Sequence, residues 1–588
     1  MHVQLNQIAE SESFDVVVVG AGGAGMSAAL FAAIDGAKVL LVERTEYLGG
    51  TTALSAATSW VPLTEKGLAI DASDTLEKAA EFLDRAVGER APRDMRMVFL
   101  QNGHKAVAKL EENSHVQYQV RPVHPDYLSE LEGSVRGGRA IEPKPFDGRL
   151  LGGDLKLVRP PIPEFTVLNG MMVDRDDIAH LLALMKSFKS FKYSVKIILR
   201  HLADRLRFGR GTRLVMGNAL ISRLLLSLKD RNVQILTQTT LESLQRDEQG
   251  VCGVVLTQNG ARRTLKVLGG VILASGGFNR HTEKRAQMLP GANTQWCPAG
   301  PGHTGAALDL ALALGARFGA ASLDAPAERA TQPVLSHAFW APVSIRKRAD
   351  GTTAVFPHFI MDRGKPGMIT LNQRGERFLN ESTSYHLFGL AMQAPNASEP
   401  CIPAWLVCDA AALKRYGLGM IRPGAGPGKS IAPFLADGYL KQAWSVAELA
   451  GELGVDPQVL SRTIATFNAS AALGEDAKFN RGTTAYQRNN GDATQGGKNP
   501  CLGPLEVAPF FAIRLYPGDI GASTGLLTDT SARVLDESDA PIPGLYAVGN
   551  DMQSIMGGTY PGPGITIGPG LTFAYLAAED ALRRITTN

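Results

Sequence analysis

The chain has 588 residues, of which 44% are hydrophobic and 20% are charged, and its formal net charge at pH 7 is +3. A chain of this length exceeds what one hydrophobic core supports, so we expect two or three domains. The composition is typical of a globular protein, and the small net charge argues against a nucleic-acid partner. No stretch reaches the roughly 18 apolar residues of a membrane span.

The first residues, MHVQLNQIAESESF, contain no basic segment followed by an apolar core, so no signal peptide is predicted. The five cysteines are dispersed, without CxxC or metal-ligand spacing. We therefore expect reduced, structural cysteines, no metal site and a cytoplasmic location.

Residues 14–43, FDVVVVGAGGAGMSAALFAAIDGAKVLLVE, predict a strand, a glycine turn, a helix and a second strand that ends at Glu43. In such a unit Gly20 allows a tight turn, Gly22 lets the backbone approach a pyrophosphate, and Gly25 lets helix and strand pack closely. The helix dipole favours the phosphates, and the Glu43 carboxylate suits the hydroxyls of an adenosine ribose. The unit predicts a dinucleotide site.

The residues after Glu43 indicate which dinucleotide is bound. Arg44 is followed by YLGGTT and Ser55, a second glycine pair with hydroxyls that suits a flavin and that nicotinamide dehydrogenases do not need. Near the other end, GLYAVGND predicts a strand and glycine turn returning to the ribityl region. We expect non-covalent FAD, because no histidine follows GGTT. The residues expected to bind it are Gly20, Gly22, Gly23, Ala24, Gly25, Glu43, Arg44, Gly50, Thr51, Thr52, Ser55, Ala274, Gly276, Gly549, Asn550, Gly564 and Ile565.

The remaining pattern predicts the order of the domains. Residues 1–300 form a first FAD-binding segment, closed by a hairpin pattern and the apolar strand VILASGGF. Residues 301–504 mix strands and helices and form an inserted substrate-capping domain. Residues 505–588 return to flavin-type motifs and end in a helix. The expected fold class is α/β, with a Rossmann-like FAD-binding domain and an inserted α+β capping, or catalytic, domain.

A basic helical insertion is expected near residues 176–212. Apolar residues recur there at helical spacing, whereas basic residues occupy another face. The apolar set is Leu181, Met185, Phe188, Val195, Ile198, Leu202 and Leu206, and the basic set is Lys186, Lys189, Lys196, Arg200 and Arg207. An ordinary surface helix is the simpler interpretation, and peripheral contact with an anionic membrane is the alternative.

The expected chemistry lies in GGTYPGPGITIGPG, residues 557–570. The hydroxyl of Tyr560 is a neutral donor, and backbone N–H groups follow at an apparent helix start. Together they could polarise a carbonyl oxygen without supplying a charge. A rigid turn with a packed tyrosine would give the same pattern.

Several motifs in order, including GAGGAG, LGGTTALS, PKPFDGRLLG, LASGGFNR, FLNESTSYHLFG, FNRGTTAYQRN, YPGDIGASTGLLTD and LYAVGNDMQSIMGGTYPGPG, cover nearly the whole chain. The chain thereby resembles the 3-ketosteroid Δ1-dehydrogenases of the fumarate reductase and succinate dehydrogenase flavoprotein superfamily. The resemblance implies an oxidoreductase of steroid degradation in which hydride passes from steroid C1 to flavin N5 and a tyrosine removes a proton from C2. It also implies an electron acceptor, a quinone or another carrier.

The site residues follow from the resemblance motif by motif. It implies that Tyr560 and the N–H of Gly564 hold the C3 ketone, that Tyr385 of NESTSYHLFG is the base, and that Tyr127 of HPDYLSE supports the base. Two segments depart from the family pattern, at residues 55–58 and 484–490, and the second leaves the identity of the cyclic ketone open.

Three alternatives remain. A desaturase of a smaller cyclic ketone would keep the tyrosine and glycine pair. A fumarate-type reductase needs convergent arginines and a histidine; the neutral TYPGPG argues against it, whereas Arg488 and Arg514 keep it open. A flavoprotein that uses FAD only structurally would not need the full tyrosine set.

Overall fold

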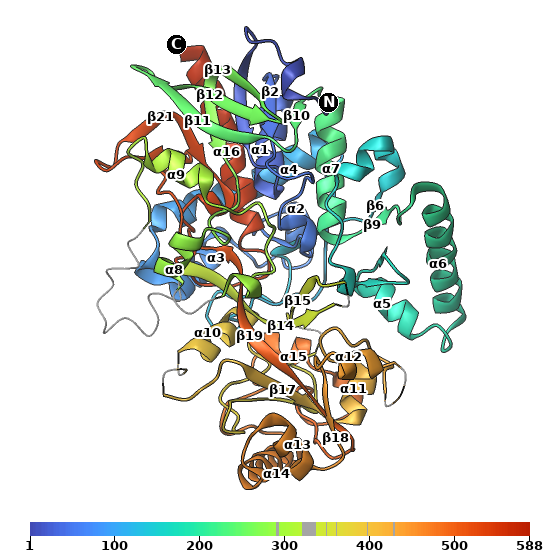
Figure 1. Cartoon of the computed structure of the whole chain (residues 1–588). Helices are drawn as coiled ribbons and strands as arrows, with labels where there is room; N and C mark the ends of the chain where they lie inside the picture. Colours follow the sequence, from blue (N-terminus) through green and yellow to red (C-terminus); the bar gives the residue numbers. More distant parts are fainter. Residues whose placement is uncertain are drawn as a thin grey trace.

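The computed structural model describes residues 1–587 except 290–292, 320–336, 349, 360–361, 395, 397, 427 and 429. Two large sheets organise these residues, one in the upper and one in the lower half of the view in Figure 1. The core of the first sheet extends to residues 338–341 of the second sheet, and the second sheet has two further cores of its own.

The first sheet has eight strands in the order β10-β2-β1-β13-β12-β11, with β21 on β13 and β20 on β21. Its parallel strands are β1 (Ser13–Val19), β2 (Val39–Val42), β10 (Gln234–Leu236), the second half of β13 (Ala261–Leu273) and β21 (Pro541–Ala547). Its antiparallel strands are β11 (Thr240–Asp247), β12 (Gly250–Gln258) and β20 (Arg533–Leu535).

Helices enclose this sheet, which explains why residues 16–19 of β1 and 39–42 of β2 are uninterrupted apolar runs rather than alternating. Three of them contact its strands: α1 (Gly23–Ile34), α9 (Ala306–Leu312) and α16 (Ile567–Thr587). Outside these, α7 (Met216–Asp230) packs on α1 and α4 (Arg93–Asn113) packs on α16. The carboxyl ends of β1, β2, β13 and β21 meet at one edge of the sheet. Loops at that edge are where a doubly wound sheet binds its ligand.

The second sheet has six antiparallel strands. They are β14 (Ala338–Lys347), β15 (Thr353–Pro357), β16 (Met368–Leu371), β17 (Ala404–Cys408), β18 (Lys441–Ala443) and β19 (Phe510–Ala522). The helices of this half are α10 (Tyr385–Gln393), α11 (Ala410–Tyr416), α12 (Ala432–Ala436), α13 (Val446–Leu453), α14 (Pro457–Leu473) and α15 (Ala485–Asn490).

The predicted fold class, α/β with a Rossmann-like domain and a further unit, is confirmed. One strand that the sequence placed in the FAD-binding domain belongs to the second sheet instead. Residues 510–522, which the sequence analysis assigned to the second FAD-binding segment, form β19 and pair with β14 and β17 in the second sheet.

Smaller elements connect the two halves. The helices are α2 (Glu65–Leu68), α3 (Leu76–Val87), α5 (Arg175–Leu182), α6 (Phe188–Phe208) and α8 (Thr282–Met288). Three small sheets comprise β3 (Ser59–Trp60) with β4 (Tyr118–Val120) and β5 (Ala140–Pro143), β6 (Phe146–Asp147) with β9 (Arg213–Leu214), and β7 (Thr166–Val167) with β8 (Met171–Met172).

The basic insertion forms α5 and α6, and α6 lies at the periphery of the molecule (Figure 1). The face of α6 turned towards the protein is mostly polar, with Ser190, Ser194, His201 and Asp204 buried. Large apolar side chains on the other face are exposed. Among the described residues, no helix is long and apolar enough to cross a bilayer.

Candidate active site

A cavity of about 500 Å³ is lined by residues from both halves of the molecule. The sequence-predicted residues that line it are Gly20, Gly22, Gly23, Ala24, Glu43, Arg44, Gly50, Thr51, Thr52, Ser55, Tyr127, Ala274, Gly276, Tyr385, Gly549, Asn550, Tyr560 and Gly564. Two predicted residues do not line this cavity: Gly25 packs behind it, and Ile565 lines a smaller cavity nearby.

The glycine turn after β1 has the geometry that a dinucleotide needs. At Gly20 φ is +107°, and a Cβ there would lie 2.3 Å from the carbonyl oxygen of Ala274. A Cβ at Gly25 would lie 1.9 Å from the carbonyl oxygen of Gly20. A Cβ at Gly22, the N-cap of α1, would meet nothing within 4 Å. Open space therefore faces the start of α1, where its dipole favours a pyrophosphate.

Glu43 is buried at the end of β2. Its Oε2 accepts a hydrogen bond from the N–H of Ala21 (3.0 Å), and its Oε1 accepts one from the N–H of Thr45 (2.8 Å). Arg159, which the sequence analysis missed, donates from Nη2 to Oγ1 of Thr45 (2.8 Å). Its Nε is buried and has no hydrogen-bond partner among the described residues. On this wall, the carboxylate of Glu43 suits the ribose of a dinucleotide, and the guanidinium of Arg159 suits a phosphate.

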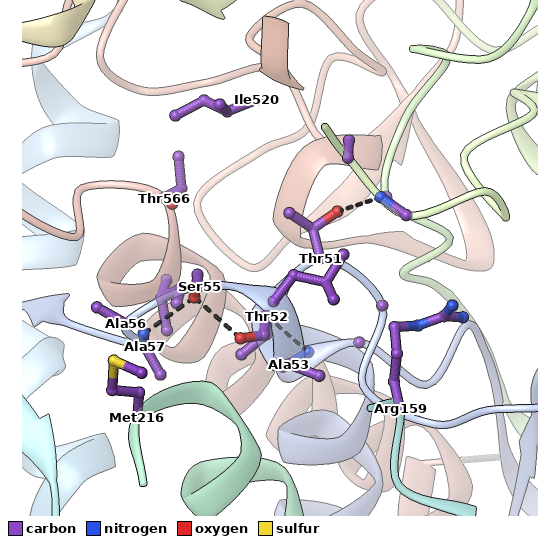
Figure 2. A pocket seen from close by; sticks show the side chains of 18 of the residues that line it. Thr51, Thr52, Ala53, Ser55, Ala56, Ala57, Arg159, Met216, Ile520 and Thr566 are labelled. Carbon is purple, nitrogen blue, oxygen red and sulfur yellow. Dashed lines mark hydrogen bonds between the residues drawn. The ribbon is translucent and has the colours of Figure 1, made fainter. Parts of the chain in front are cut away.

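The loop of Thr51, Thr52 and Ser55 runs along the cavity wall (Figure 2). Oγ1 of Thr51 accepts a hydrogen bond from the N–H of Gly300 (2.9 Å), and Oγ1 of Thr52 accepts one from the N–H of Gly23 (3.2 Å). The Ser55 hydroxyl donates to the carbonyl of Thr52 (2.9 Å). The bond of Thr52 holds the loop against the glycine turn, and residues 50–58 all line the cavity.

His303 is a second residue that sequence reasoning missed. Its Nε2 lies 3.3 Å from Oγ1 of Thr51, and its buried Nδ1 has no hydrogen-bond partner among the described residues. Burial lowers the pKa of His303 to about 4, so the ring is neutral at pH 7. The unpartnered nitrogens of His303 and Arg159, together with the open space at Gly22, fit a bound FAD.

Farther along the cavity, the three predicted tyrosines meet. The hydroxyl oxygens of Tyr127 and Tyr385 are 3.4 Å apart. The ring of Tyr560 lies 5.1 Å from that of Tyr385 and 5.8 Å from that of Tyr127, between centroids. A fourth tyrosine, Tyr486 of α15, packs 4.7 Å from Tyr127. It comes from the 484–490 segment that departs from the family pattern, but its contact with Tyr127 was not predicted.

Buried polar groups fix Tyr127. Its N–H donates to the carbonyl of Pro561 (2.8 Å), which ties it to the loop of Tyr560. The preceding carboxylate, Asp126, accepts from Nε1 of Trp60 (2.7 Å) and from Nη1 of Arg139 (2.9 Å). Such a paired, hydrogen-bonded charge specifies one position of the loop.

Tyr385 is the first residue of α10, whose N-cap Ser384 accepts a hydrogen bond from the N–H of Leu387 (3.3 Å). The guanidinium of Arg363, only 2% exposed, donates to the carbonyls of Thr383 (2.7 Å) and Phe359 (2.7 Å). The Phe359 ring packs against Tyr385, 4.9 Å away. Arg363 therefore holds the segments on both sides of the Tyr385 hydroxyl.

Gly564 adopts φ +90°, and a Cβ there would lie 2.1 Å from the carbonyl oxygen of Thr58. Its own carbonyl accepts from the N–H groups of Trp60 (3.1 Å) and Gly568 (3.0 Å). Only glycine fits this position without displacing the loop.

Burial keeps the tyrosine cluster neutral at pH 7. It raises the pKa values of Tyr127 and Tyr385 well above that of a free tyrosine, and it raises the pKa of Tyr560. The adjacent His386 is also neutral, because burial lowers its pKa to about 3. Arg488 and Arg514, the residues consistent with the alternative of a fumarate-type reductase, do not line the cavity.

Three comparisons extend these findings. Residues 15–567 match the FAD binding domain family. The chain is 37% identical to a 4-oxocyclohex-2-ene-1-carboxylate 5-dehydrogenase of Sinomonas cyclohexanicum, covering 97% of this chain and 94% of the relative. It is 35% identical to a 3-oxosteroid 1-dehydrogenase of Mycolicibacterium smegmatis, covering 97% of each. The crystal structure of 3-ketosteroid delta1-dehydrogenase from Sterolibacterium denitrificans in complex with 1,4-androstadiene-3,17-dione superimposes with a TM-score of 0.87 at 32% identity, covering 98% of this chain and 100% of that one.

Proposed function

Because this chain belongs to the family of FAD-dependent oxidoreductases that includes the 3-oxosteroid 1-dehydrogenases, we propose that it forms a C1–C2 double bond beside the 3-keto group of a steroid. Its cofactor is FAD. The observation that carries the proposal is the meeting of Tyr127, Tyr385 and Tyr560 in the same cavity as the predicted FAD-binding residues.

The first step is activation of the ketone. The Tyr560 hydroxyl and the Gly564 N–H donate to the carbonyl oxygen, where negative charge develops as the α-proton leaves. Preoriented donors at such an oxygen lower the barrier more than the same donors in water would. Tyr560 is suited to this role because its raised pKa keeps its proton in place.

The second step removes two hydrogens. Tyr385 takes the C2 proton, the C2–H electron pair becomes the new C1–C2 bond, and hydrogen leaves C1 with its electron pair as hydride. FAD, when bound, supplies the hydride acceptor. Tyr127 donates a hydrogen bond to the Tyr385 oxygen and so stabilises the phenolate that acts as the base. A quinone or another carrier then takes the electrons.

The substrate class rests on two kinds of relative. The relatives named as 3-oxosteroid 1-dehydrogenases favour a 3-ketosteroid, whereas the Sinomonas relative is named for a six-membered ring ketone that carries a carboxylate. A desaturase of a smaller cyclic ketone is therefore the second candidate.

Turnover with an artificial electron acceptor tests both candidates. Androst-4-ene-3,17-dione and 4-oxocyclohexanecarboxylate are incubated separately with holoenzyme, and the products are analysed by mass spectrometry. Loss of two hydrogens from the steroid supports the first candidate, and loss from the small ring only supports the second. Absence of product from both contradicts the proposed function.

We also propose that α6 docks the protein on an anionic lipid surface. Its outward side chains include Phe188 (82% exposed) and Leu206 (92% exposed), and Met185 just before it is 87% exposed. Exposed basic residues flank them: Lys189, Lys192, Lys196, Arg205 and Arg207. An apolar stripe beside cations complements an anionic bilayer interface, whereas the buried face of α6 carries four polar residues and Ile197, which packs in a small apolar cluster.

The docking surface lies next to the substrate cavity, because α5 packs on α6 and its residues Arg175 and Ile178 line the cavity. A ketone with an apolar ring skeleton would thus enter from the lipid. Holoenzyme is sedimented with vesicles of phosphatidylcholine, with and without phosphatidylglycerol. We expect binding only to the anionic vesicles, loss of binding in Phe188→Ser/Leu206→Ser, and retention in Leu473→Ser, which changes a side chain 67% exposed on α14. If the wild type, Phe188→Ser/Leu206→Ser and Leu473→Ser sediment equally with the anionic vesicles, the docking of α6 is contradicted.

A further inference from the structure

We infer that Arg175, with His124 beside it, binds a carboxylate carried by the ring-ketone substrate, so that the preferred substrate is an oxo acid rather than an uncharged ketone. The inference rests on the proposed ketone dehydrogenation and adds the second group that the site recognises.

Arg175 is a half-buried residue of the cavity wall, at the first position of α5. Among the described residues, its guanidinium has no hydrogen bond and no ion pair, unlike those of Arg44, Arg121 and Arg159 on the same wall. A half-buried guanidinium without a carboxylate partner has five donors available for a ligand.

The start of α5, and with it Arg175, lies on the part of the cavity wall that carries His124 and Tyr127. Arg121 links the two, because it pairs both with Asp176 (3.6 Å) and with Glu142 (2.7 Å), whose Oε1 lies 3.7 Å from Nδ1 of His124. The charge of Arg175 acts on the same groups. It contributes to lowering the pKa of His124 and opposes the rise in the pKa values of Tyr127 and Tyr486 caused by burial. The guanidinium therefore lies near the place where the ketone is activated. A carboxylate bound there would belong to a substrate whose carbonyl oxygen reaches Tyr560.

The ring of His124 is a second, independent reason to expect a ligand here. It lines the same cavity, its side chain is 11% exposed, and its Nδ1 is buried without a hydrogen-bond partner among the described residues. The nearest carboxylate oxygen, Oε1 of Glu142, is 3.7 Å away, beyond hydrogen-bond distance. A buried, unsatisfied ring nitrogen is costly unless a ligand completes it.

The neighbouring carboxylates already have partners. Glu142 accepts from Nε of Arg121 (2.7 Å), and Asp176 lies 3.6 Å from Nη1 of the same arginine. Asp174 caps α5 by accepting from the N–H groups of Asp176 and Asp177, and its Oδ2 lies 3.5 Å from Arg213.

The carboxylate of Asp177 pairs with Arg213 (2.6 Å) and accepts from the Tyr193 hydroxyl (2.7 Å). Arg175 is thus left to a group from outside the protein. A substrate carboxylate is the group whose geometry matches a guanidinium.

Two pairs of compounds, each an acid and its methyl ester, distinguish a small ring acid from a steroid acid as the substrate that carries this carboxylate. The first is 4-oxocyclohexanecarboxylate and its methyl ester, and the second is 3-oxochol-4-en-24-oate and its methyl ester. For wild-type holoenzyme we expect KM at least tenfold lower for the acid than for the ester in one pair, with similar kcat. The pair in which this occurs identifies a small ring acid or a steroid acid as the substrate.

Arg175→Gln should then raise KM for the preferred acid by tenfold or more, leave its kcat within about threefold, and leave the ester unchanged, because the charge binds ground and transition states alike. Arg175→Lys should recover part of the affinity. The matched control is Arg136→Gln, which removes an exposed charge outside the cavity and should leave all values unchanged. Flavin absorbance verifies that each variant is folded.

The possible results are distinct. Equal KM values for acid and ester in both pairs overturn the carboxylate site but leave the proposed function intact. An unchanged acid KM in Arg175→Gln overturns the role of Arg175. Absence of turnover with all four compounds overturns the proposed function and the inference with it. If Arg175→Gln does not fold, the acid-to-ester ratio of the wild-type enzyme decides.

Discussion

Replacing Gly564 with alanine tests the carbonyl-binding pair directly. Gly564 has φ +90°, and an alanine Cβ would lie 2.1 Å from the carbonyl oxygen of Thr58, so the loop must move and carry its N–H away from the substrate oxygen. Loss of one preorganised backbone donor costs about 10²–10³ in kcat, or roughly 3–4 kcal/mol. The unfavourable φ adds about 1–2 kcal/mol of backbone strain, which lowers stability rather than turnover.

Gly36→Ala is the matched control, because Gly36 has φ +89° and a Cβ there would meet nothing within 4 Å. Both variants should lose some thermal stability, but only Gly564→Ala should lose turnover. Melting temperature, flavin content and kcat are measured on the same preparations. Wild-type kcat in a Gly564→Ala enzyme that retains FAD would refute the role of this loop.

Four further outcomes are expected. Tyr385→Phe should lower kcat by about 10²–10⁴ with FAD still bound, whereas Tyr416→Phe, outside the cavity, should not; equal rates would remove Tyr385 from the base role. Because burial raises the pKa of Tyr385 well above that of a free tyrosine, the base is scarce at pH 7 and kcat/KM should climb as pH rises from 7 to 10; a flat profile would argue against a tyrosine base. Arg363→Met leaves buried carbonyl groups without a donor, which lowers the free energy of unfolding by about 1–3 kcal/mol for each carbonyl, so the melting temperature and kcat should both fall. An unchanged kcat would show that Arg363 does not position Tyr385. Glu43→Ala should weaken FAD binding by about 10- to 100-fold in a flavin-release titration, and unchanged affinity would exclude a ribose contact.

The glycine turns were predictable from sequence because each directly follows an apolar parallel strand. Such strands bring Gly20, Gly276 and Gly549 to one edge of the sheet, and all three line the cavity. Local sequence therefore carries most of the information about this end of the site.

Other contributions depend on tertiary contacts that local sequence does not reveal. Arg159 and Tyr486 stand in segments without a glycine turn or a periodic pattern that marks a site. His303 lies in the glycine-rich segment CPAGPGHTG, but that segment follows no apolar strand. Only the packing of distant segments brings these residues to Thr45, Tyr127 and Thr51. Likewise β19 follows the capping segment but pairs across the second sheet, a long-range choice that its neighbouring motifs do not reveal.

The pattern of α6 shows a different limit. Periodicity identified an amphipathic helix, but it does not state which face meets the protein. In the structure a polar face, including Ser194, His201 and Asp204, packs inward because Asp204 accepts from the N–H (3.1 Å) and hydroxyl (2.6 Å) of Thr212. Of the predicted apolar set, Met185, Phe188, Leu202 and Leu206 are left outside, whereas Leu181 and Ile198 pack on Ile197 and its neighbours.

Anaerobic mixing of the holoenzyme with ring ketones is the most direct measurement of the central claim. Flavin absorbance is followed with androst-4-ene-3,17-dione and with 4-oxocyclohexanecarboxylate, and the products are analysed by mass. Bleaching together with the loss of two hydrogens from a ketone is the predicted result, and Tyr385→Phe should slow it sharply. If the flavin stays oxidised with every ring ketone, while fumarate alone reoxidises the prereduced enzyme, the chain is a reductase and the dehydrogenation account is wrong.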